Sequence, residues 1–254
     1  MDDLDRSSRA ARDWLDEAIR RVEADANRSA DTHLVPLRLT RFPGIDLYLK
    51  DESTHPTGSL KHRLARAHRA GRRRVPSRRR SHHGVCRGGE IGGGNWRALP
   101  RPVHLRRTGH HDTFLAVVDP ENSAFFPGWR DCDDAVTMST GSRIEGIGRP
   151  RVEPSFIGGV VDRMIAVPDA ASVAAARALE PVLGRRVGAS TGTNLWGALH
   201  IARELHAAGR DASIVTLLCD GGECYAHTYF DDGWLAEHGL DLEPYREQLR
   251  TLLG

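Results

Sequence analysis

The sequence predicts an α/β fold in which strands of a parallel sheet alternate with helices. Two continuous apolar runs, residues 113–119 (TFLAVVD) and 213–220 (SIVTLLCD), each end in an aspartate, as expected for strands buried on both faces. Residues 163–169 (RMIAVPD) predict a weaker third strand. Residues 171–184 and 194–209 repeat their apolar side chains at helical spacing, and each ends at a glycine that suits a helix C-terminus. This alternation is typical of an α/β architecture.

The N-terminal quarter of the chain contributes further elements. Residues 4–26 place apolar side chains three and four positions apart, which predicts a helix that docks by one face. Residues 45–50 (IDLYLK) have the composition of a strand. A turn at residues 56–58 (PTG) then predicts a helix that starts near Ser59, with Lys61 in its first turn.

Composition excludes several classes of protein. A chain of 254 residues can bury a substantial core, and its net charge of +2 gives no argument for nucleic acid or a membrane surface. Its four cysteines form neither a disulfide framework nor a pair of CxxC motifs for zinc. The first residues, MDDLDRSSRA, are polar, and no apolar run is long enough to span a bilayer. We therefore expect a cytoplasmic protein in a reducing compartment, with no membrane attachment.

Residues 71–109 break the alternating pattern. They contain eleven arginines, no lysine and a single acid, Glu90, and show neither helical nor strand periodicity. We expect this segment to be disordered, and its composition is what results when GC-rich DNA is read in a shifted frame. The predicted organisation is therefore an N-terminal helix and lysine segment (1–70), this anomalous segment (71–109), and a C-terminal α/β domain (110–254).

Several motifs offer candidate chemistry, and each also has a purely structural interpretation. Lys61, at a helix start, can form a Schiff base with pyridoxal phosphate, although most such lysines are solvated charges. Residues 188–194 (GASTGTN) can present hydroxyls and free N–H groups to an anion or a heteroaromatic nitrogen, or can simply cap a helix. Gly146 and Gly148 flank Ile147 in a loop that lets a backbone approach a ligand, or that is an ordinary turn.

Residues 219–225 (CDGGECY) directly follow a predicted strand. Asp220, Gly221 and Gly222 would then lie at the carboxyl edge of the sheet, where ligands of open α/β sheets bind. The alternative is a plain connection between a strand and the next helix.

Taken together and in order, these motifs resemble those of the fold-type II pyridoxal-phosphate enzymes, the cysteine synthase and cystathionine β-synthase family. The matching stretches are LKDESTHPTGSLKHR, VVDPENS, RIEGIG, GASTGTN and CDGGECY. VVDPENSAFF and STGTNLWGA are most similar to the actinobacterial L-cysteine desulfhydrase branch. The resemblance covers residues 1 to about 70 and about 110 to 240. It implies a three-layer α/β fold like that of the tryptophan synthase β subunit, with an incomplete N-terminal domain.

The resemblance implies pyridoxal 5'-phosphate as the cofactor and gives roles to the matching residues. It makes Lys61 the Schiff-base lysine and Ser190 the hydroxyl that meets the pyridine nitrogen. It places Asp220, Gly221 and Gly222 around the edge of the ring. It makes Gly146, Ile147 and Gly148 the loop beside the substrate. A serine at that nitrogen implies a ring that is not held protonated, which suits β-elimination, with Lys61 taking the Cα proton.

The implied activity is β-elimination or β-replacement on L-cysteine or a related β-substituted amino acid. Elimination from cysteine gives sulfide, pyruvate and ammonia, as in a cysteine desulfhydrase, whereas replacement is the reaction of a cysteine synthase. The family also implies a small amino-acid substrate and a homodimer, and nothing in it implies a metal.

Two loops of the family pattern are not found in the sequence. They are the Ser-Ser/Thr-Gly-Asn/Ser-Thr loop for the substrate carboxylate and the Gly-Thr-Gly-Gly-Thr loop for the cofactor phosphate, and only 55 residues separate Lys61 from Val117. The alternative is therefore a non-catalytic remnant or a nucleic-acid-binding module that uses the arginine-rich segment. Trp96 is the only aromatic residue there, which argues against single-strand recognition. Two adjacent histidine pairs could suggest a metal site: His82 and His83, and His110 and His111. We do not favour it, because neither pair has the helical or hairpin spacing that brings metal ligands together.

Overall fold

The computed structural model describes residues 32–62 and 113–253, together with Gly92, Gly93 and five residues near the N-terminus. Those five are Trp14, Asp16, Glu17, Arg20 and Arg21, and all of them are helical. The rest of the helix predicted at residues 4–26 lies outside the described residues. The arginine-rich segment 71–109 also lies outside them, apart from Gly92 and Gly93, as do the histidines considered for a metal. Predictions about those parts, including the nucleic-acid alternative, stay predictions.

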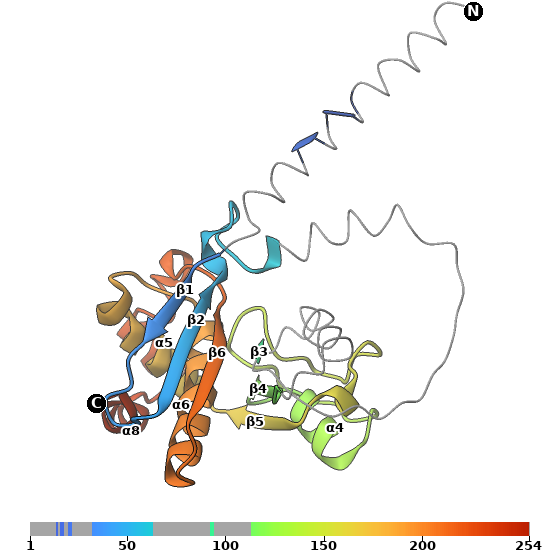
Figure 1. The fold of residues 1–254 in the computed structure, drawn as a ribbon. Helices are drawn as coiled ribbons and strands as arrows, with labels where there is room; N and C mark the ends of the chain where they lie inside the picture. Colours follow the sequence, from blue (N-terminus) through green and yellow to red (C-terminus); the bar gives the residue numbers. More distant parts are fainter. Residues whose placement is uncertain are drawn as a thin grey trace, which may run out of the picture.

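One three-stranded sheet combines two strands from the N-terminal part of the chain with one from the C-terminal part (Figure 1). Its order is β1 (Leu34–Leu37), β2 (Ile45–Asp51), β6 (Ala212–Leu218), with β1 antiparallel to β2 and β2 parallel to β6. Asp51, at the end of β2, lies opposite Leu218, at the end of β6. The strands predicted at residues 45–50 and 213–220 are therefore confirmed, and both end at the same edge of one sheet.

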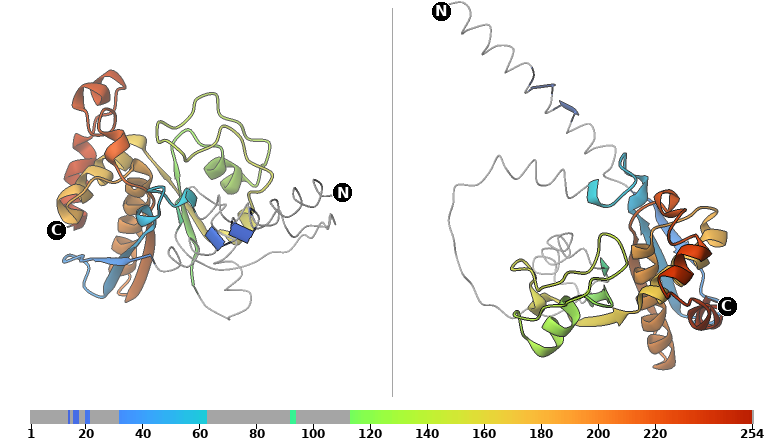
Figure 2. Two further views of the ribbon diagram at one scale, coloured as in Figure 1. Left: turned by 90° about the horizontal axis from the view of Figure 1, so that it is seen from above. Right: turned by 180° about the vertical axis from the view of Figure 1, so that it is seen from behind.

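The second sheet is parallel and has the order β3 (Gly92–Gly93), β4 (Ala116–Pro120), β5 (Arg163–Val167). Every residue of β4 is buried, as predicted for a strand covered on both faces. The same prediction is wrong for β6, whose burial alternates and whose Val215 is 42 % exposed. The physical reason is that, within the part of the chain that the structure describes, helices cover one side of the sheet that contains β6, as the two views in Figure 2 show.

Two helices form the centre of the molecule. α5 (Asp169–Leu183) packs along α6 (Ala189–Ala207), and α6 also contacts strands of both sheets. α5 ends at Gly184, whose φ of 67° is the left-handed conformation predicted for a C-terminal glycine. α6 begins at Ala189, five residues before the predicted start at Asn194, so the GASTGTN motif forms its first turn and a half rather than a loop that precedes it.

Small residues in α6 permit this close packing. A Cβ on Gly192 would overlap the carbonyl oxygen of Ser172 in α5, and a Cβ on Gly197 would overlap Val118 of β4. Contact between the two helices therefore explains the glycine at residue 192.

Three further helices had no counterpart among the predicted elements: α4 (Phe125–Asp131), α7 (Asp232–Glu237) and α8 (Glu243–Leu253). The last packs against α5 and α6 and contributes Leu249 and Leu252 to the main core. Among the described residues, the helices are all too short or too polar to cross a bilayer.

Candidate active site

The site is built where three segments that are distant in the sequence run side by side. Ser59 forms a β-bridge with Asp220, the Leu60 N–H donates to the Cys219 carbonyl (2.7 Å), and the Gly221 N–H donates to the Gly58 carbonyl (3.2 Å). The chain that leaves β6 therefore holds the turn that leads to Lys61.

On its other side, the same stretch of chain meets the residues that begin α6. Val187 forms a bridge with Gly221, and the Gly188 N–H donates to the Asp220 carbonyl (3.2 Å). A Cβ on Gly188 would overlap the Asp220 carboxylate, and one on Gly222 would lie 2.6 Å from the Val187 nitrogen. Glycine at residue 222 therefore lets the two backbones approach, and glycine at residue 188 leaves room for the Asp220 side chain. Together they bring the start of α6 next to the stretch of chain that holds Lys61.

Five of the residues predicted for the site line one cavity: Lys61, Gly146, Ile147, Ser190 and Asp220. Ser59, Leu60, Glu145 and Cys219 complete its wall. The structure thus brings together the predicted lysine, the predicted serine and the first part of the predicted substrate loop.

The remaining predicted residues do not line this cavity. Gly148 faces Pro120, Ser142 and Ser123, which would lie 3.1 to 3.5 Å from a Cβ at that position. Gly221 and Gly222 contribute through their backbones, which pair with Gly58 and Arg186.

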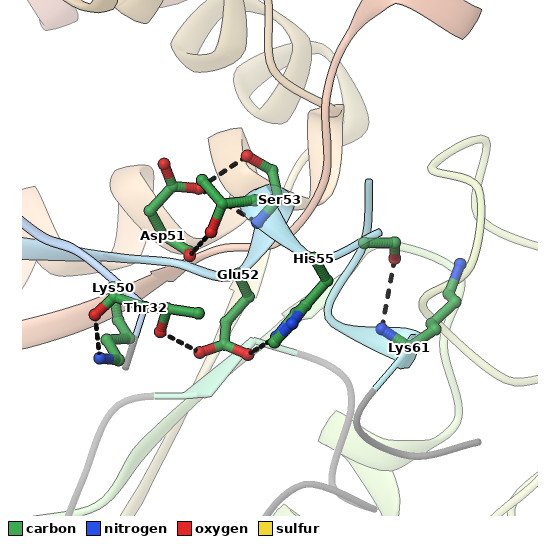
Figure 3. Close-up of polar contacts among 9 residues, drawn as sticks. Thr32, Lys50, Asp51, Glu52, Ser53, His55 and Lys61 are labelled. Carbon is green, nitrogen blue, oxygen red and sulfur yellow. Dashed lines mark hydrogen bonds and ion pairs between the residues drawn. The ribbon is translucent and has the colours of Figure 1, made fainter. Parts of the chain in front are cut away.

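Gly146 and Lys61 fit each other closely. Gly146 has a φ of +84°, a left-handed conformation that glycine adopts without strain, and a Cβ there would lie 2.5 Å from Lys61 Nζ. In Figure 3 the Lys61 side chain extends away from the polar cluster around Glu52 and His55. The absence of a side chain at residue 146 therefore leaves the space that the Lys61 amine uses.

Ser190 and Asp220 form a hydrogen-bonded pair on the cavity wall. The Ser190 hydroxyl donates to Asp220 Oδ1 (3.3 Å), and the Tyr225 hydroxyl donates to Asp220 Oδ2 (3.1 Å). Burial raises the pKa of Asp220, while the hydrogen bond from Tyr225 and the positive charge of Lys61 oppose this shift. Burial, followed by the charge of Asp220, also raises the pKa of the Tyr225 phenol.

Cys219 is the other reactive group on the wall, and its environment keeps it protonated. Burial raises the pKa of its thiol to about 12, with a further contribution from the neighbouring Asp220 charge. Its Sγ accepts a hydrogen bond from Asn194 Nδ2 at 3.3 Å. Burial therefore disfavours the thiolate, the form in which Cys219 would act as a nucleophile.

Tyr229 and Asp169 hold the loop that carries Gly146, and the sequence did not single out either residue. The Glu145 N–H donates to the Tyr229 hydroxyl, which itself donates to the Arg143 carbonyl, both at 2.8 Å. Asp169 accepts from the Ser142 hydroxyl (2.9 Å) and from the Arg143 N–H (2.6 Å). Tyr229 follows the CDGGECY motif by four residues, but no periodicity in the sequence marks it as a loop anchor.

The strand end that precedes Lys61 carries a buried polar network (Figure 3). The Glu52 carboxylate accepts from the Thr32 hydroxyl and lies beside His55 Nε2, both at 2.8 Å. Asp51 accepts from both the N–H (3.1 Å) and the hydroxyl (2.6 Å) of Ser53. The polar residues of the KDESTH stretch therefore fix the backbone just ahead of Lys61 and do not face the cavity.

The residues present fit the aldehyde and ring portions of the cofactor that the resemblance implies. Lys61 offers an amine, Ser190 offers a hydroxyl, and Gly146 leaves the amine room on the same wall. The cavity volume of about 10 Å³ is near the minimum for one water. A ring therefore requires the exposed Lys61 side chain and the loop around Gly146 to separate.

Comparisons with known proteins place these features in context. No protein-family profile matches the chain. The chain is 39 % identical over 338 residues to L-cysteine desulfhydrase Cds1 of Mycobacterium tuberculosis, an alignment that covers 91 % of this chain and 92 % of the relative. Since 91 % of 254 residues is about 231, about 107 of the 338 aligned positions have no residue in this chain. A chain that lacks the two family loops is expected to be shorter than its relatives, as this chain is.

Cysteine synthases match over shorter stretches. A putative cysteine synthase of Sinorhizobium fredii is 38 % identical over 87 residues, which are 34 % of this chain and 24 % of that protein. Cysteine synthase 1 of Neurospora crassa is 28 % identical over 150 residues, which are 58 % of this chain and 39 % of that protein.

Solved structures confirm the predicted fold class. O-ureido-L-serine synthase superposes with a TM-score of 0.54 at 15 % identity, covering 81 % of this chain and 96 % of that chain. O-acetylserine sulfhydrylase isoform 3 of Entamoeba histolytica gives a TM-score of 0.55 at 16 % identity, with 90 % and 95 % covered. At these identities the likeness concerns the fold, which is the α/β fold of fold-type II enzymes.

Proposed function

Because the chain belongs to the family of L-cysteine desulfhydrases and cysteine synthases, we propose that it is a pyridoxal 5'-phosphate-dependent enzyme of cysteine metabolism. The observation that carries this proposal is that Lys61 and Ser190, which the family motifs pair, line one cavity together with Gly146. The substrate is then a small amino acid with a leaving group on Cβ. Location in the cytoplasm and assembly as a homodimer remain predictions of the sequence.

Among the reactions of the family, we favour β-elimination from L-cysteine. The desulfhydrase relative aligns with 91 % of this chain, whereas the two cysteine synthases align with 34 % and 58 %. Elimination breaks the Cβ–S bond and yields sulfide, and hydrolysis of the remaining fragment gives pyruvate and ammonia.

The residues that line the cavity have different proposed roles. Pyridoxal phosphate, when bound, supplies the electron sink that makes the Cα proton of the amino acid acidic. Lys61 would hold the cofactor through its amine, and that amine, once released and neutral, would accept the Cα proton of the substrate. Ser190 would meet the ring nitrogen of the bound cofactor, and Gly146 and Ile147, which line the same cavity, would lie beside the substrate.

The chain offers an unusually clear test, because Lys50 and Lys61 are its only two lysines. Lys50 Nζ donates to the Thr32 carbonyl at 2.5 Å, so its amine is occupied by the backbone. We expect incubation with pyridoxal phosphate, borohydride reduction and peptide mapping by mass spectrometry to place the adduct on Lys61. We also expect the protein to release sulfide from L-cysteine.

Lys61→Ala should lose both the adduct and sulfide release, whereas the matched control Lys50→Arg should keep both. An adduct on Lys50, or an adduct of equal yield in Lys61→Ala, would overturn the assignment of Lys61. A specific adduct on Lys61 with no sulfide released would leave cofactor binding but exclude desulfhydrase activity for this chain.

A further inference from the structure

The sheet of β1, β2 and β6 has an outer face that no helix covers within the part of the chain that the structure describes (Figure 2). Burial alternates along β2 and β6, and the strand register aligns their outward side chains in rows across the sheet. The rows are Leu34, Lys50 and Leu217; then Pro36, Tyr48 and Val215; then Asp46 and Ser213. A face that stays in water normally carries polar side chains, whereas the first two rows here are largely apolar.

The two apolar rows present little charge. Their one charged side chain is Lys50, and its Nζ donates to the Thr32 carbonyl at 2.5 Å, at the edge of the sheet. Leu34 is 49 % exposed and Val215 is 42 % exposed, which places both among the most exposed large apolar side chains of the described residues. The rows therefore have the composition of a surface that packs against another apolar one.

The N-terminal segment has a face of the same kind. Among its described residues, Trp14 is helical and 72 % exposed, and Arg21 Nε donates to Glu17 Oε1 at 2.8 Å. At 100° per residue, Asp16, Glu17 and Arg20 lie on the helix side opposite Ala18. The sequence places five further apolar residues on the Ala18 side or beside it: Ala11, Trp14, Leu15, Ile19 and Val22. One side of this helix is therefore charged and the other is an apolar stripe.

We propose that the apolar stripe of residues 4–26 packs, as a helix, on the outer face of the β1, β2 and β6 sheet of the same chain, on the side opposite α6. The sheet would then be covered on both sides. The inference concerns the fold of the chain and does not depend on the cofactor.

The dimensions of the two surfaces agree. Three strands span about 10 Å between the axes of the outer two, which is about the diameter of one helix. The apolar stripe from Ala11 to Val22 rises by about 16 Å, and the seven-residue strands β2 and β6 are about 20 Å long. One helix is therefore enough to cover the apolar rows.

The connection to the sheet also favours this segment. Residues 27–31 join it to Thr32, which is buried and whose hydroxyl donates to Glu52 Oε1 at 2.8 Å. β1 begins two residues later, at Leu34, in the first apolar row. Five residues are a typical connection between a helix and a strand that pack together. The chain thus delivers the end of the helix to the edge of the face that it would cover.

The arginine-rich segment 71–109 is a poorer occupant. It has eleven arginines and neither helical nor strand periodicity, so it offers no continuous apolar stripe. Neither of the two apolar rows contains an acid to pair with its charges. A second copy of the chain is the remaining alternative, and the experiments below distinguish it.

Val215→Thr tests whether the face is covered, because both side chains suit a strand and threonine adds a hydroxyl. An apolar cover would leave this hydroxyl without water, so we expect the midpoint of urea unfolding of the full chain to fall by about 0.5 M. Val182→Thr is the matched control, since Val182 is 55 % exposed on α5, and it should leave the midpoint unchanged. Equal midpoints for the two variants would overturn the inference.

Trp14→Gln tests which segment covers the face. Glutamine favours a helix at least as well as tryptophan, so a lower midpoint reports lost apolar contact. The double variant of Trp14→Gln and Val215→Thr should fall by less than the sum of the two single variants, because both weaken the same contact. Additive effects, or no effect of Trp14→Gln, would overturn the assignment to residues 4–26.

A cross-link locates the helix directly. We expect a short bismaleimide to join Ala18→Cys to Val215→Cys within one chain, as shown by mass spectrometry of the linked peptides. Arg20→Cys with Val215→Cys is the control pair, because residue 20 lies on the charged side of the helix and should not be linked. Links of equal yield from residues 18 and 20, or no link from residue 18, would contradict the proposed packing. A link that joins two chains would assign the face to a second copy and would also overturn the inference.

Discussion

Arg185 Nη2 lies 2.6 Å from Asp51 Oδ2, and Arg185 Nη1 donates to the Ser53 hydroxyl at 2.7 Å. Asp51 ends β2, ten residues before Lys61, whereas Arg185 lies in the short connection between α5 and α6, five residues before Ser190. This ion pair therefore ties together the two segments that carry the cofactor lysine and the serine.

Arg185→Ala should destabilise the fold by about 1–3 kcal/mol. Breaking a fully buried pair costs about 3–5 kcal/mol, but the Arg185 side chain is 35 % exposed, so solvent compensates part of the loss at Asp51, which is 6 % exposed. The measurement is the free energy of unfolding from urea titration. Arg130→Ala, which breaks an exposed pair with Asp131, is the control and should leave the midpoint unchanged. Equal midpoints for the two variants would mean that the Arg185 pair does not anchor the site.

Gly146→Ala and Gly148→Ala form a matched pair for the cavity. Both positions have positive φ, +84° and +73°, so both variants should lose about 1–2 kcal/mol of stability from backbone strain. Only the Cβ at residue 146 would meet Lys61, at 2.5 Å from Nζ. Since residue 146 also lines the cavity and residue 148 does not, we expect Gly146→Ala to reduce cofactor binding at Lys61 more than Gly148→Ala, as measured by titration of the adduct. Equal losses would show that Gly148, as the family resemblance implies, belongs to the site after all.

Gly192→Ala tests the close approach of α5 and α6. The added methyl group would overlap the Ser172 carbonyl, and backbone cannot move aside as a flexible side chain can, so we expect a loss of about 1–3 kcal/mol in stability. Gly141→Ala is the control, because a Cβ there has open space and an ordinary φ. Unfolding of both variants in urea measures the difference. A Gly192→Ala protein as stable as Gly141→Ala would contradict the packing described here.

The sequence predicted the elements whose signals are local and failed where contacts are long-range. Apolar runs and periodicity predicted five elements: β2, β4, β5, α5 and α6. The end of α5 at Gly184 was predicted from the glycine itself. The meeting of Lys61 with Ser190 was implied only by the order of the family motifs. No periodicity could have shown that Asp220 lies behind Ser190, that Tyr229 holds the Glu145 loop, or that Arg185 reaches Asp51, because each pair joins side chains from separate elements.

Asp119 gives a prediction about pH. This residue of the VVDPENS motif is completely buried, its Oδ2 accepts from the Phe126 N–H at 2.9 Å, and burial raises its pKa from 3.8 to about 6. Between about pH 4 and pH 6 the folded state keeps a proton that the unfolded chain has released. The linkage relation then requires this residue to lower stability as pH rises through that window, with the full penalty present above about pH 6.

Asp119→Asn removes this titration while keeping an oxygen that can accept from Phe126. The variant should therefore gain stability relative to the wild type as pH rises, by about 2–3 kcal/mol between pH 4 and pH 7, since two units of pKa correspond to about that free energy. Urea unfolding of both proteins at several pH values measures the difference, and the exposed Asp134→Asn provides the control for the loss of one negative charge. The prediction is wrong if the difference in the free energy of unfolding between the two proteins does not change with pH, or if the wild type becomes the more stable one toward pH 7. Either result would show that the buried carboxyl ionises without cost, because neighbouring donors compensate fully for its loss of water.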